Sequence, residues 1–473
     1  MTEPLAQQPL SAPTGQPVGT TRLHEAFGPA MRWLLLAALV ASYPVALFIP
    51  MGSGFSLVFH IGLPLFTVLA MAATAYLAVT PLRNTGGGAS YRPRIVAAAV
   101  WLYAGLHGVA AVAGKTADLY RIADTAGPVL LAAFFAVAPR RLIPRRLDVV
   151  MLCLWCLQVV HCLLQHLAGY EPVGLAGNRN WAATLLAVLA PWACLALRRV
   201  GGPRRGLSAP IGRVVLQGCV IVISLVIVYA CHCRATWLGL ALYGVTMFLL
   251  KPCSWPGRVL VLAVLTSLLL GVVIAWPEKV GEAIEGDIRL PMYASTLRMV
   301  ADHPLLGVGP GNFCRDFVLY RSRAQKARAV AAPVTEHPHC ELLDVGVSVG
   351  VLGALIWAAV FFMPLVLSPG RSLPRRLAHA SLWLLLVHGM LDKALIQPPT
   401  SVLAVLFAGL LWRPWLRLRA DPRRRGPRAQ VLRLPLAALV LLLGLHVSVR
   451  EAWVGALFRQ AYLAEAQGQF YES

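Results

Sequence analysis

Residues 342–367 read LLDVGVSVGVLGALIWAAVFFMPLVL, and Asp344 is the one charged side chain among them. A helix that crosses a bilayer needs about 20 consecutive, mostly apolar residues, so this stretch predicts a transmembrane helix. The whole chain of 473 residues has the same character: 58% are hydrophobic, 13% are charged and the mean hydropathy is +0.68. Soluble domains carry about 25% charged residues. This composition therefore excludes a soluble cytosolic enzyme.

Similar apolar stretches recur along the chain and predict an all-α polytopic membrane protein with about 12–13 transmembrane helices. The first of them follows a polar lead of about 30 residues without a clear cleavage site, which disfavours a secretory signal peptide. Besides 342–367, the predicted spans are 31–50, 55–81, 95–114, 124–138, 147–168, 181–197, 213–231, 235–250, 258–276, 378–395, 401–415 and 434–449.

Basic residues are concentrated on alternate connections between these spans. The connections after the second, fourth, sixth and eighth spans contain several arginines or lysines, whereas those after the first, third, fifth and seventh contain few. Positively charged connections stay in the cytoplasm. The formal net charge of +22 therefore indicates topology before it indicates a nucleic-acid partner, and we expect none.

The predicted organisation follows from this alternation. A cytoplasmic tail at 1–30 precedes the first nine transmembrane helices at 31–276. One large periplasmic loop at 277–341 separates the ninth and tenth spans. The remaining helices occupy 342–449, and a helical C-terminal tail occupies 450–473. The sequence leaves open whether the last span crosses the membrane.

The loop at 277–341 contains as many acidic as basic residues and is too long for a simple connection. Loops of this length are usually functional. The stretch from Arg298 predicts a helix that Pro304 stops, and the glycine-rich sequence GVGPGN follows at 307–312. This sequence lacks the Gly-Lys-Ser/Thr ending of a phosphate-binding loop, so we interpret it as a structural turn.

A histidine stands where the loop enters the next span. His339 is followed at helical spacing by Leu343, Gly346, Gly350 and Gly353, which predicts one helical face. Glycines on such a face let another helix approach closely. A helix N-terminus disfavours the imidazolium ion, so His339 could accept a proton at neutral pH. The alternative interpretation is a capping or interfacial histidine.

Further polar residues are predicted at the same outer ends of the spans. They are Arg234, the sequence Asn178-Arg179-Asn180, the loop residue Arg289, and the pair Asp392-Lys393. Each could be an interfacial anchor, and for Lys393 snorkelling towards water is the preferred interpretation. Taken together, arginines and a histidine at one membrane face suit an anionic lipid head group, particularly a pyrophosphate.

These residues give the sequence a resemblance to the O-antigen ligase/polymerase superfamily, and most closely to its lipopolysaccharide O-antigen ligases. The resemblance is carried by Asn178-Arg179-Asn180, by the sequence Arg234-Ala-Thr-Trp-Leu-Gly, by 289–312 with its ending DHPLLGVGPGNF, and by His339 with Gly350 and Gly353. Cys340 departs from the ligase motif, which has Asn, Ser or Gln there. The motifs cover about 60 residues, and the layout of the spans covers most of the chain.

The resemblance implies a fold similar to that of GT-C glycosyltransferases, placed in the inner membrane of a Gram-negative bacterium with its active site facing the periplasm. It implies transfer of an O-antigen glycan from undecaprenyl pyrophosphate to a sugar hydroxyl of lipid A–core. It further implies inversion at the anomeric carbon without a metal or another cofactor. The implied partners are this donor, this acceptor and membrane lipids, and the oligomeric state is left unknown.

The resemblance also implies roles for individual residues. His339 is expected to be the general base, with His337 as the alternative. Arg234 and Arg289 are expected to bind the donor pyrophosphate, while Asp392 orients His339 or an arginine. Arg179 and Arg298 are lower-ranked donor contacts.

Three other interpretations stay open at this point. An O-antigen polymerase would use the same donor but a second lipid-linked glycan as acceptor, and a protein O-oligosaccharyltransferase would glycosylate a protein. A polysaccharide or lipid transporter would instead need ionisable residues near the middle of the membrane. The periplasm also permits a disulfide between Cys314 and Cys340 as an alternative to free thiols.

Overall fold

The computed structural model describes the parts of the chain that carry most of the predicted spans and more than half of the predicted loop. Predicted spans 31–50, 55–81, 258–276 and 434–449 lie outside the described residues, as do both predicted tails. The described residues are 82–84, 91–116, 119–138, 146–176, 178–200, 208–249, 289–322, 325, 335, 337–367, 372–393, 395, 398–416 and 418–420.

The described residues form a helical bundle, and each long helix overlaps one predicted span, which confirms the all-α polytopic class. The helices α6, α7, α8 and α15 contain segments long and apolar enough to cross a membrane. The total of about 12–13 crossings stays a prediction. The long helices are α4 (Tyr91–Ala113), α5 (Leu119–Val137), α6 (Leu147–Leu167), α7 (Arg179–Val200), α8 (Ser208–Ala230), α9 (Arg234–Leu249), α15 (Glu341–Leu367), α16 (Leu373–Leu391) and α17 (Pro398–Leu416).

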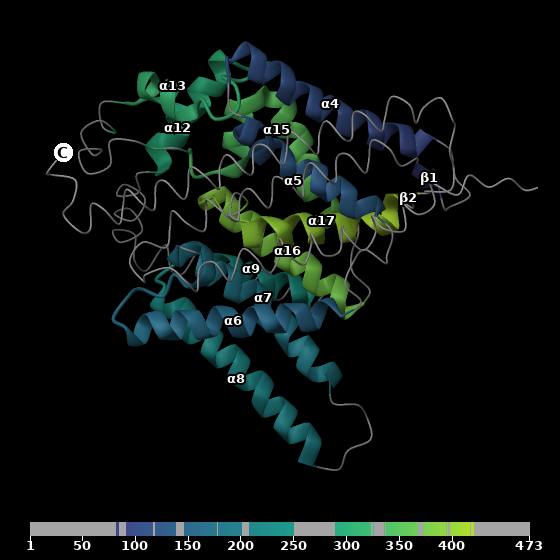
Figure 1. Ribbon diagram of the computed structural model, residues 1–473, viewed down its shortest axis with the longest axis vertical. Helices are drawn as coiled ribbons and strands as arrows, with labels where there is room; N and C mark the ends of the chain where they lie inside the picture. Colours follow the sequence, from purple (N-terminus) through teal and green to yellow (C-terminus); the bar gives the residue numbers. More distant parts are fainter. Residues whose placement is uncertain are drawn as a thin grey trace, which may run out of the picture.

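Three short elements accompany the long helices. The 3-10 turn η2 (Gly174–Ala176) precedes α7, while α12 (Arg289–Asp302) and α13 (Phe313–Tyr320) belong to the predicted periplasmic loop. The helix α12 ends two residues before Pro304, which confirms the predicted stop. Figure 1 shows α12 and α13 close together at one end of α15.

A two-stranded antiparallel sheet qualifies the all-helical expectation. The strand β1 (Leu82–Asn84) pairs with β2 (Leu418–Ala420), and Arg83 lies opposite Arg419. The two extended segments satisfy each other's backbone hydrogen bonds, a pairing between distant parts of the chain that apolar periodicity does not reveal. The sheet joins the segment before α4 to the segment after α17.

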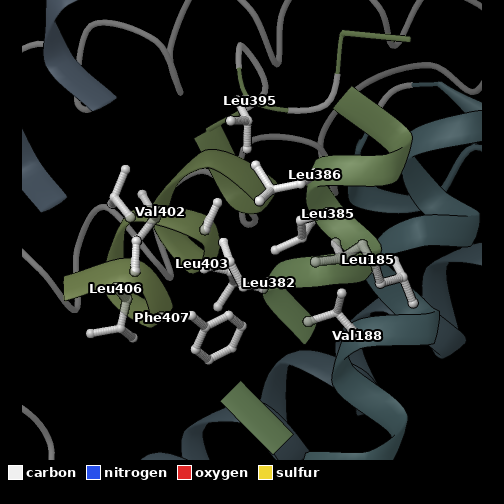
Figure 2. Packing of buried hydrophobic residues seen from close by; sticks show 14 of the residues in the cluster. Leu185, Val188, Leu382, Leu385, Leu386, Leu395, Val402, Leu403, Leu406 and Phe407 are labelled. Atoms are coloured by element: carbon white, nitrogen blue, oxygen red, sulfur yellow. The ribbon is translucent and has the colours of Figure 1, made fainter. Parts of the chain in front are cut away.

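The centre of the bundle is formed by close helix packing. Figure 2 shows Leu382 and Leu385 of α16 between Leu185 of α7 and Leu403 of α17, and all four residues are fully buried. The ring of Phe407 stacks on Trp192 of α7 at 5.4 Å. A Cβ at Gly409 would meet the carbonyl oxygen of Ala132 at 2.8 Å, so glycine permits the contact between α17 and α5. Such close approach drives helix association where lipid is as apolar as the helices.

The helix α8 has the opposite character, because much of its apolar surface is exposed. Val214, Val222 and Val226 are each at least 60% exposed. In Figure 1, α8 projects from the rest of the bundle. An exposed apolar face of this kind suits contact with lipid in a multi-pass membrane protein.

The structure corrects the prediction of one continuous helical face from His339 to Gly353. His339 lies before α15 with a φ of +52°, and α15 itself is interrupted at Val349 and Gly350, where φ is −139° and +78°. The glycine-rich turn of the loop packs at this interruption. The backbone N–H of Val351 donates to the carbonyl oxygen of Pro304 at 2.8 Å, and that of Val308 donates to Val347 at 2.8 Å. Irregular backbone at a membrane helix is tolerated where protein satisfies its polar groups in this way.

The structure of this region confirms the predicted turn. It does not contain a disulfide between Cys314 and Cys340. Gly307, Gly309 and Gly311 all have positive φ, which an L-residue rarely adopts. Cys314 lies in the first turn of α13, whereas Cys340 is buried immediately before α15, and both are free thiols. The turn is therefore held by backbone contacts with α15.

The interruption of α15 predicts different effects of alanine at two glycines one turn apart. A Cβ at Gly350 would collide with the carbonyl oxygen of Leu305 in a conformation that is essentially restricted to glycine, so Gly350→Ala should cost about 1–3 kcal/mol or more. A Cβ at Gly346 would make ordinary contact with Val300 at 3.5 Å. Thermal unfolding in detergent should show a lower midpoint for Gly350→Ala and a nearly unchanged midpoint for Gly346→Ala. Equal midpoints would contradict this packing.

Candidate active site

Asp392 lies at the end of α16, where four segments of the chain meet. Its backbone has left the helical conformation, with φ −157° and ψ 168°, and its N–H donates to the carbonyl oxygen of His388 at 2.7 Å. The backbone N–H of Lys393 donates to Asp392 Oδ1 at 2.8 Å. The residue is 5% exposed. Its carboxylate is therefore fixed against the end of its own helix and nearly removed from water.

His339 is bound directly to this carboxylate. Its Nδ1 lies 2.9 Å from Asp392 Oδ1, and its side chain is 44% exposed. A carboxylate accepts hydrogen bonds, so Nδ1–H donates to it and the neutral ring keeps Nε2 free of a proton. The positive φ of His339 belongs to a strained backbone region that is common at functional sites. The arrangement can accept a proton at Nε2.

The second carboxylate oxygen faces two more segments. Asn180 Nδ2, at the start of α7, donates to Asp392 Oδ2 at 3.0 Å, and Arg289 Nη2, at the start of α12, lies 3.9 Å away. The hydrogen bonds from His339 and Asn180 and the nearby Arg289 guanidinium offset the burial of this carboxylate and favour its ionised form. The carboxylate therefore stays ionised and can hold the His339 ring in one tautomer.

Tyr293 attaches the loop helix α12 to both sides of this site. Its hydroxyl lies 3.0 Å from the carbonyl oxygen of His339 and 3.3 Å from that of Met390 near the end of α16, and it can donate to either. Tyr293 follows Arg289 by four residues, so both lie on one face of α12. The contact explains how a helix of the predicted loop brings Arg289 to Asp392.

The structure corrects the interpretation of Lys393 as a snorkelling anchor. Lys393 is 3% exposed, and its Nζ lies 3.0 Å from Asp344 Oδ2 and 2.6 Å from His337 Nδ1. A buried charge needs such a partner, and Asp344 of α15 supplies it. Burial and the neighbouring Lys393 ammonium lower the pKa of His337 to about 4, against the opposing influence of Asp344. His337 is thus neutral, and its Nδ1 accepts from Lys393.

The other residues predicted to contact the donor pyrophosphate have different surroundings. Arg234 begins α9 with an exposed side chain. Arg179, adjacent to Asn180, forms an exposed ion pair with Glu171 at 3.0 Å. Arg298 donates to Ser295 Oγ and to the carbonyl oxygen of Tyr320, further along α12. The structure therefore brings together His339, Arg289 and Asp392, whereas Arg298 contributes to the packing of α12 on α13.

The chemistry of this site combines a proton acceptor with cationic side chains. His339 Nε2 can take a proton while Asp392 stabilises the resulting imidazolium. Guanidinium groups such as that of Arg289 bind phosphate oxygens well. Within the described parts of the chain, no group of three or more His, Cys, Asp or Glu side chains could hold a metal ion.

Residues 219–358 match a family model described as O-antigen ligase. The matched segment is less than half of the chain, and it supports membership of the O-antigen ligase/polymerase superfamily. Superfamily membership implies lipid-linked glycan substrates and a membrane setting. Comparisons with curated proteins and with solved structures find no match.

The match to the superfamily covers one part of the site and not the other. It includes Arg234, Arg289 and His339, and it ends before α16 with Asp392. The segment that holds Asn180 also lies outside it. The interactions of Asp392 therefore connect the matched segment to helices on either side of it in the sequence.

Sequence reasoning missed several residues that support this site. Tyr293 and His388 were not singled out, although each stands four residues from a predicted site residue and so one helical turn away. Asp344 was treated only as part of an apolar span. A buried carboxylate in such a span is costly without a partner, so its presence was itself a signal for a nearby cation.

The buried pair of Lys393 and Asp344 predicts a strong effect of removing either partner alone. Lys393→Met leaves a buried carboxylate unpaired and should cost roughly 3–5 kcal/mol of stability, and Asp344→Leu should cost a similar amount. The double variant leaves no unpaired charge, so it should recover part of the loss. The measurement is the midpoint of thermal unfolding in detergent.

The exposed pair of Arg179 and Glu171 provides the matched control. Glu171→Gln removes an ion pair in which both side chains are about half exposed or more, so it should change stability by less than about 1 kcal/mol. Additive losses in the double variant of Lys393 and Asp344 would contradict the pairing.

Proposed function

We propose that the protein transfers an O-antigen glycan from undecaprenyl pyrophosphate to a sugar hydroxyl of lipid A–core, at the periplasmic face of the inner membrane of a Gram-negative bacterium. The single observation that carries the proposal is the 2.9 Å contact between His339 Nδ1 and Asp392 Oδ1 on a half-exposed ring. Membership of the O-antigen ligase/polymerase superfamily supports the class of substrate.

In the proposed reaction, His339 is the general base. Its Nε2 takes the proton of the acceptor hydroxyl, and the oxygen attacks the anomeric carbon of the donor glycan. The bond from that carbon to the pyrophosphate oxygen breaks, its electron pair leaves with the lipid pyrophosphate, and the anomeric configuration inverts. Asp392 keeps the ring oriented and stabilises the imidazolium that forms.

The proposed role of the arginines is to stabilise the charge on the leaving pyrophosphate. Arg289 is oriented by its position 3.9 Å from Asp392, and α12 is held in place by Tyr293. Arg234 is exposed at the start of α9, and α9 packs against α16, the helix that ends at Asp392. Positioned cations of this kind stabilise developing charge without reorganisation during the reaction. We accordingly propose a metal-independent transfer.

The proposal predicts the product and its dependence on His339. Purified protein should join the glycan of a lipid-pyrophosphate donor to rough lipopolysaccharide, with a chelator present and no nucleotide added. His339→Ala should lower the rate by roughly 10²–10⁴-fold, because a general base contributes about that much. His303→Ala alters an exposed histidine just beyond α12 and should leave the rate unchanged.

Each other product of this assay would replace the proposal. Growth of longer lipid-linked chains, without transfer to lipopolysaccharide, would indicate a polymerase. Transfer to a protein would indicate an O-oligosaccharyltransferase, and no product of any kind would favour a transporter. Transfer that survives in His339→Ala would remove His339 as the base, and loss of activity with the chelator would contradict metal independence.

A further inference from the structure

A second histidine faces the opposite side of the Asp392 carboxylate. His388 lies in α16 one turn before Asp392 and is completely buried. Its Nε2 is 4.0 Å from Asp392 Oδ2 and has no hydrogen-bond partner within the described residues. Buried polar atoms almost always have a partner. The carboxylate that orients His339 is therefore a charged group within reach of this nitrogen.

The other ring nitrogen is fixed by two buried threonines. His388 Nδ1 lies 2.6 Å from Thr184 Oγ1 in α7, and Thr184 Oγ1 lies 2.8 Å from Thr236 Oγ1 in α9. Thr236 Oγ1 also lies 3.2 Å from Cys233 Sγ, so two proton arrangements are open to this chain of groups. A lone pair on Nε2 would face the Asp392 carboxylate, which favours the arrangement in which Thr184 donates to Nδ1. In that assignment the proton of the neutral ring is on Nε2, where its N–H dipole points towards Asp392. The three helices thus present one oriented dipole to the carboxylate.

The charged and polar groups around Asp392 divide between its two oxygens. His339 and the backbone N–H of Lys393 face Oδ1, whereas Asn180, Arg289 and His388 face Oδ2. A donor at Oδ2 draws negative charge away from Oδ1 and limits rotation of the carboxylate. His388 can therefore influence both the position of the His339 ring and the strength with which the ring holds a second proton.

We propose that His388 is a positioning residue that acts on His339 through Asp392, with its Nε2–H aligned on the carboxylate by Thr184 and Thr236. His388 itself is completely buried and does not touch substrate. The proposal rests on the proposed transferase function and deepens it. It assigns to the chain a second histidine that affects the reaction without being a base.

Two substitutions of His388 separate this role from simple packing. A glutamine places an amide N–H close to the position of Nε2, whereas an asparagine places its polar atoms close to Nδ1 and cannot reach Asp392. We expect His388→Gln to keep the transfer rate within a few fold of the wild type. His388→Asn should lower the rate roughly 10-fold, because the His339 ring is no longer held in its reactive orientation. If His388 only satisfied Thr184, the order of the two variants would be reversed.

The pH dependence gives a readout that a packing defect does not change. Without the dipole at Oδ2, the carboxylate attracts the proton on the His339 ring more strongly, so the ring becomes neutral only at higher pH. The acid limb of the pH–rate profile should therefore move upwards by roughly half a pH unit in His388→Asn and stay in place in His388→Gln.

A substrate-free measurement keeps this inference separate from the proposed function. Diethyl pyrocarbonate modifies neutral histidine, and His339 is partly exposed while His388 is not. Peptide mass spectrometry can follow modification of His339 against pH in the purified protein. The midpoint should move upwards in His388→Asn and not in His388→Gln. A shift in this measurement supports the inference even if the wild type transfers no glycan, in which case only the proposed function fails.

His379 provides the matched control on the same helix. It is 4% exposed, and its Nε2 is 2.6 Å from the carbonyl oxygen of Leu365, more than two turns from Asp392. His379→Gln and His379→Asn should leave the midpoint of His339 modification unchanged, whatever they do to stability. Identical midpoints for His388→Gln, His388→Asn and the wild type would overturn the proposal, and so would an equal shift in the His379 variants.

Discussion

The arrangement of the site depends on one nearly buried carboxylate, that of Asp392. Its two oxygens face the start of α7 through Asn180, the start of α12 through Arg289, and the segment before α15 through His339. These segments are far apart in the sequence. An ionised group with this little exposure is stable only while its partners stay in place, so the same contacts order the partners.

The loop helices reach this carboxylate because their connecting turn forms its hydrogen bonds with other parts of the protein. The turn at 303–312 binds the interrupted part of α15 through Pro304 and Val308, and Asn312 Nδ2 donates to the carbonyl oxygen of Gly114 at 2.8 Å. Tyr293 then links α12 to His339 and Met390. A segment that the sequence describes as a periplasmic loop is thus attached firmly to the helical bundle. This rigidity suits a site in which a base and a cation must keep fixed positions.

Sequence reasoning predicted the parts of this structure that depend on local patterns. Apolar length located the helices, Pro304 ended α12, and the chemistry of the side chains singled out His339, Arg289 and Asp392. The pairing of distant residues was beyond it. Lys393 was misinterpreted because its partner Asp344 belongs to another helix, and β1 was missed because its partner strand lies more than 300 residues away.

The interruption of α15 was missed for a related reason. Gly346, Gly350 and Gly353 have the spacing of a helical face, and that spacing is the same whether or not the helix is continuous. Only the contact of Gly350 with Leu305 and Pro304 distinguishes the two cases. His388 illustrates the same limit, since its position one turn before Asp392 was visible but its burial and its contact with Thr184 were not.

The central claim, that Asp392 organises a proton acceptor at His339, is tested most directly by the transfer rate of Asp392→Asn. An asparagine has the same shape but cannot accept at both oxygens, so it either turns an amide N–H towards His339 or leaves the donor of Asn180 unpaired. The account predicts a loss of about 10³–10⁴-fold in transfer, with a folded protein in the membrane. A variant that transfers glycan at the wild-type rate would contradict it.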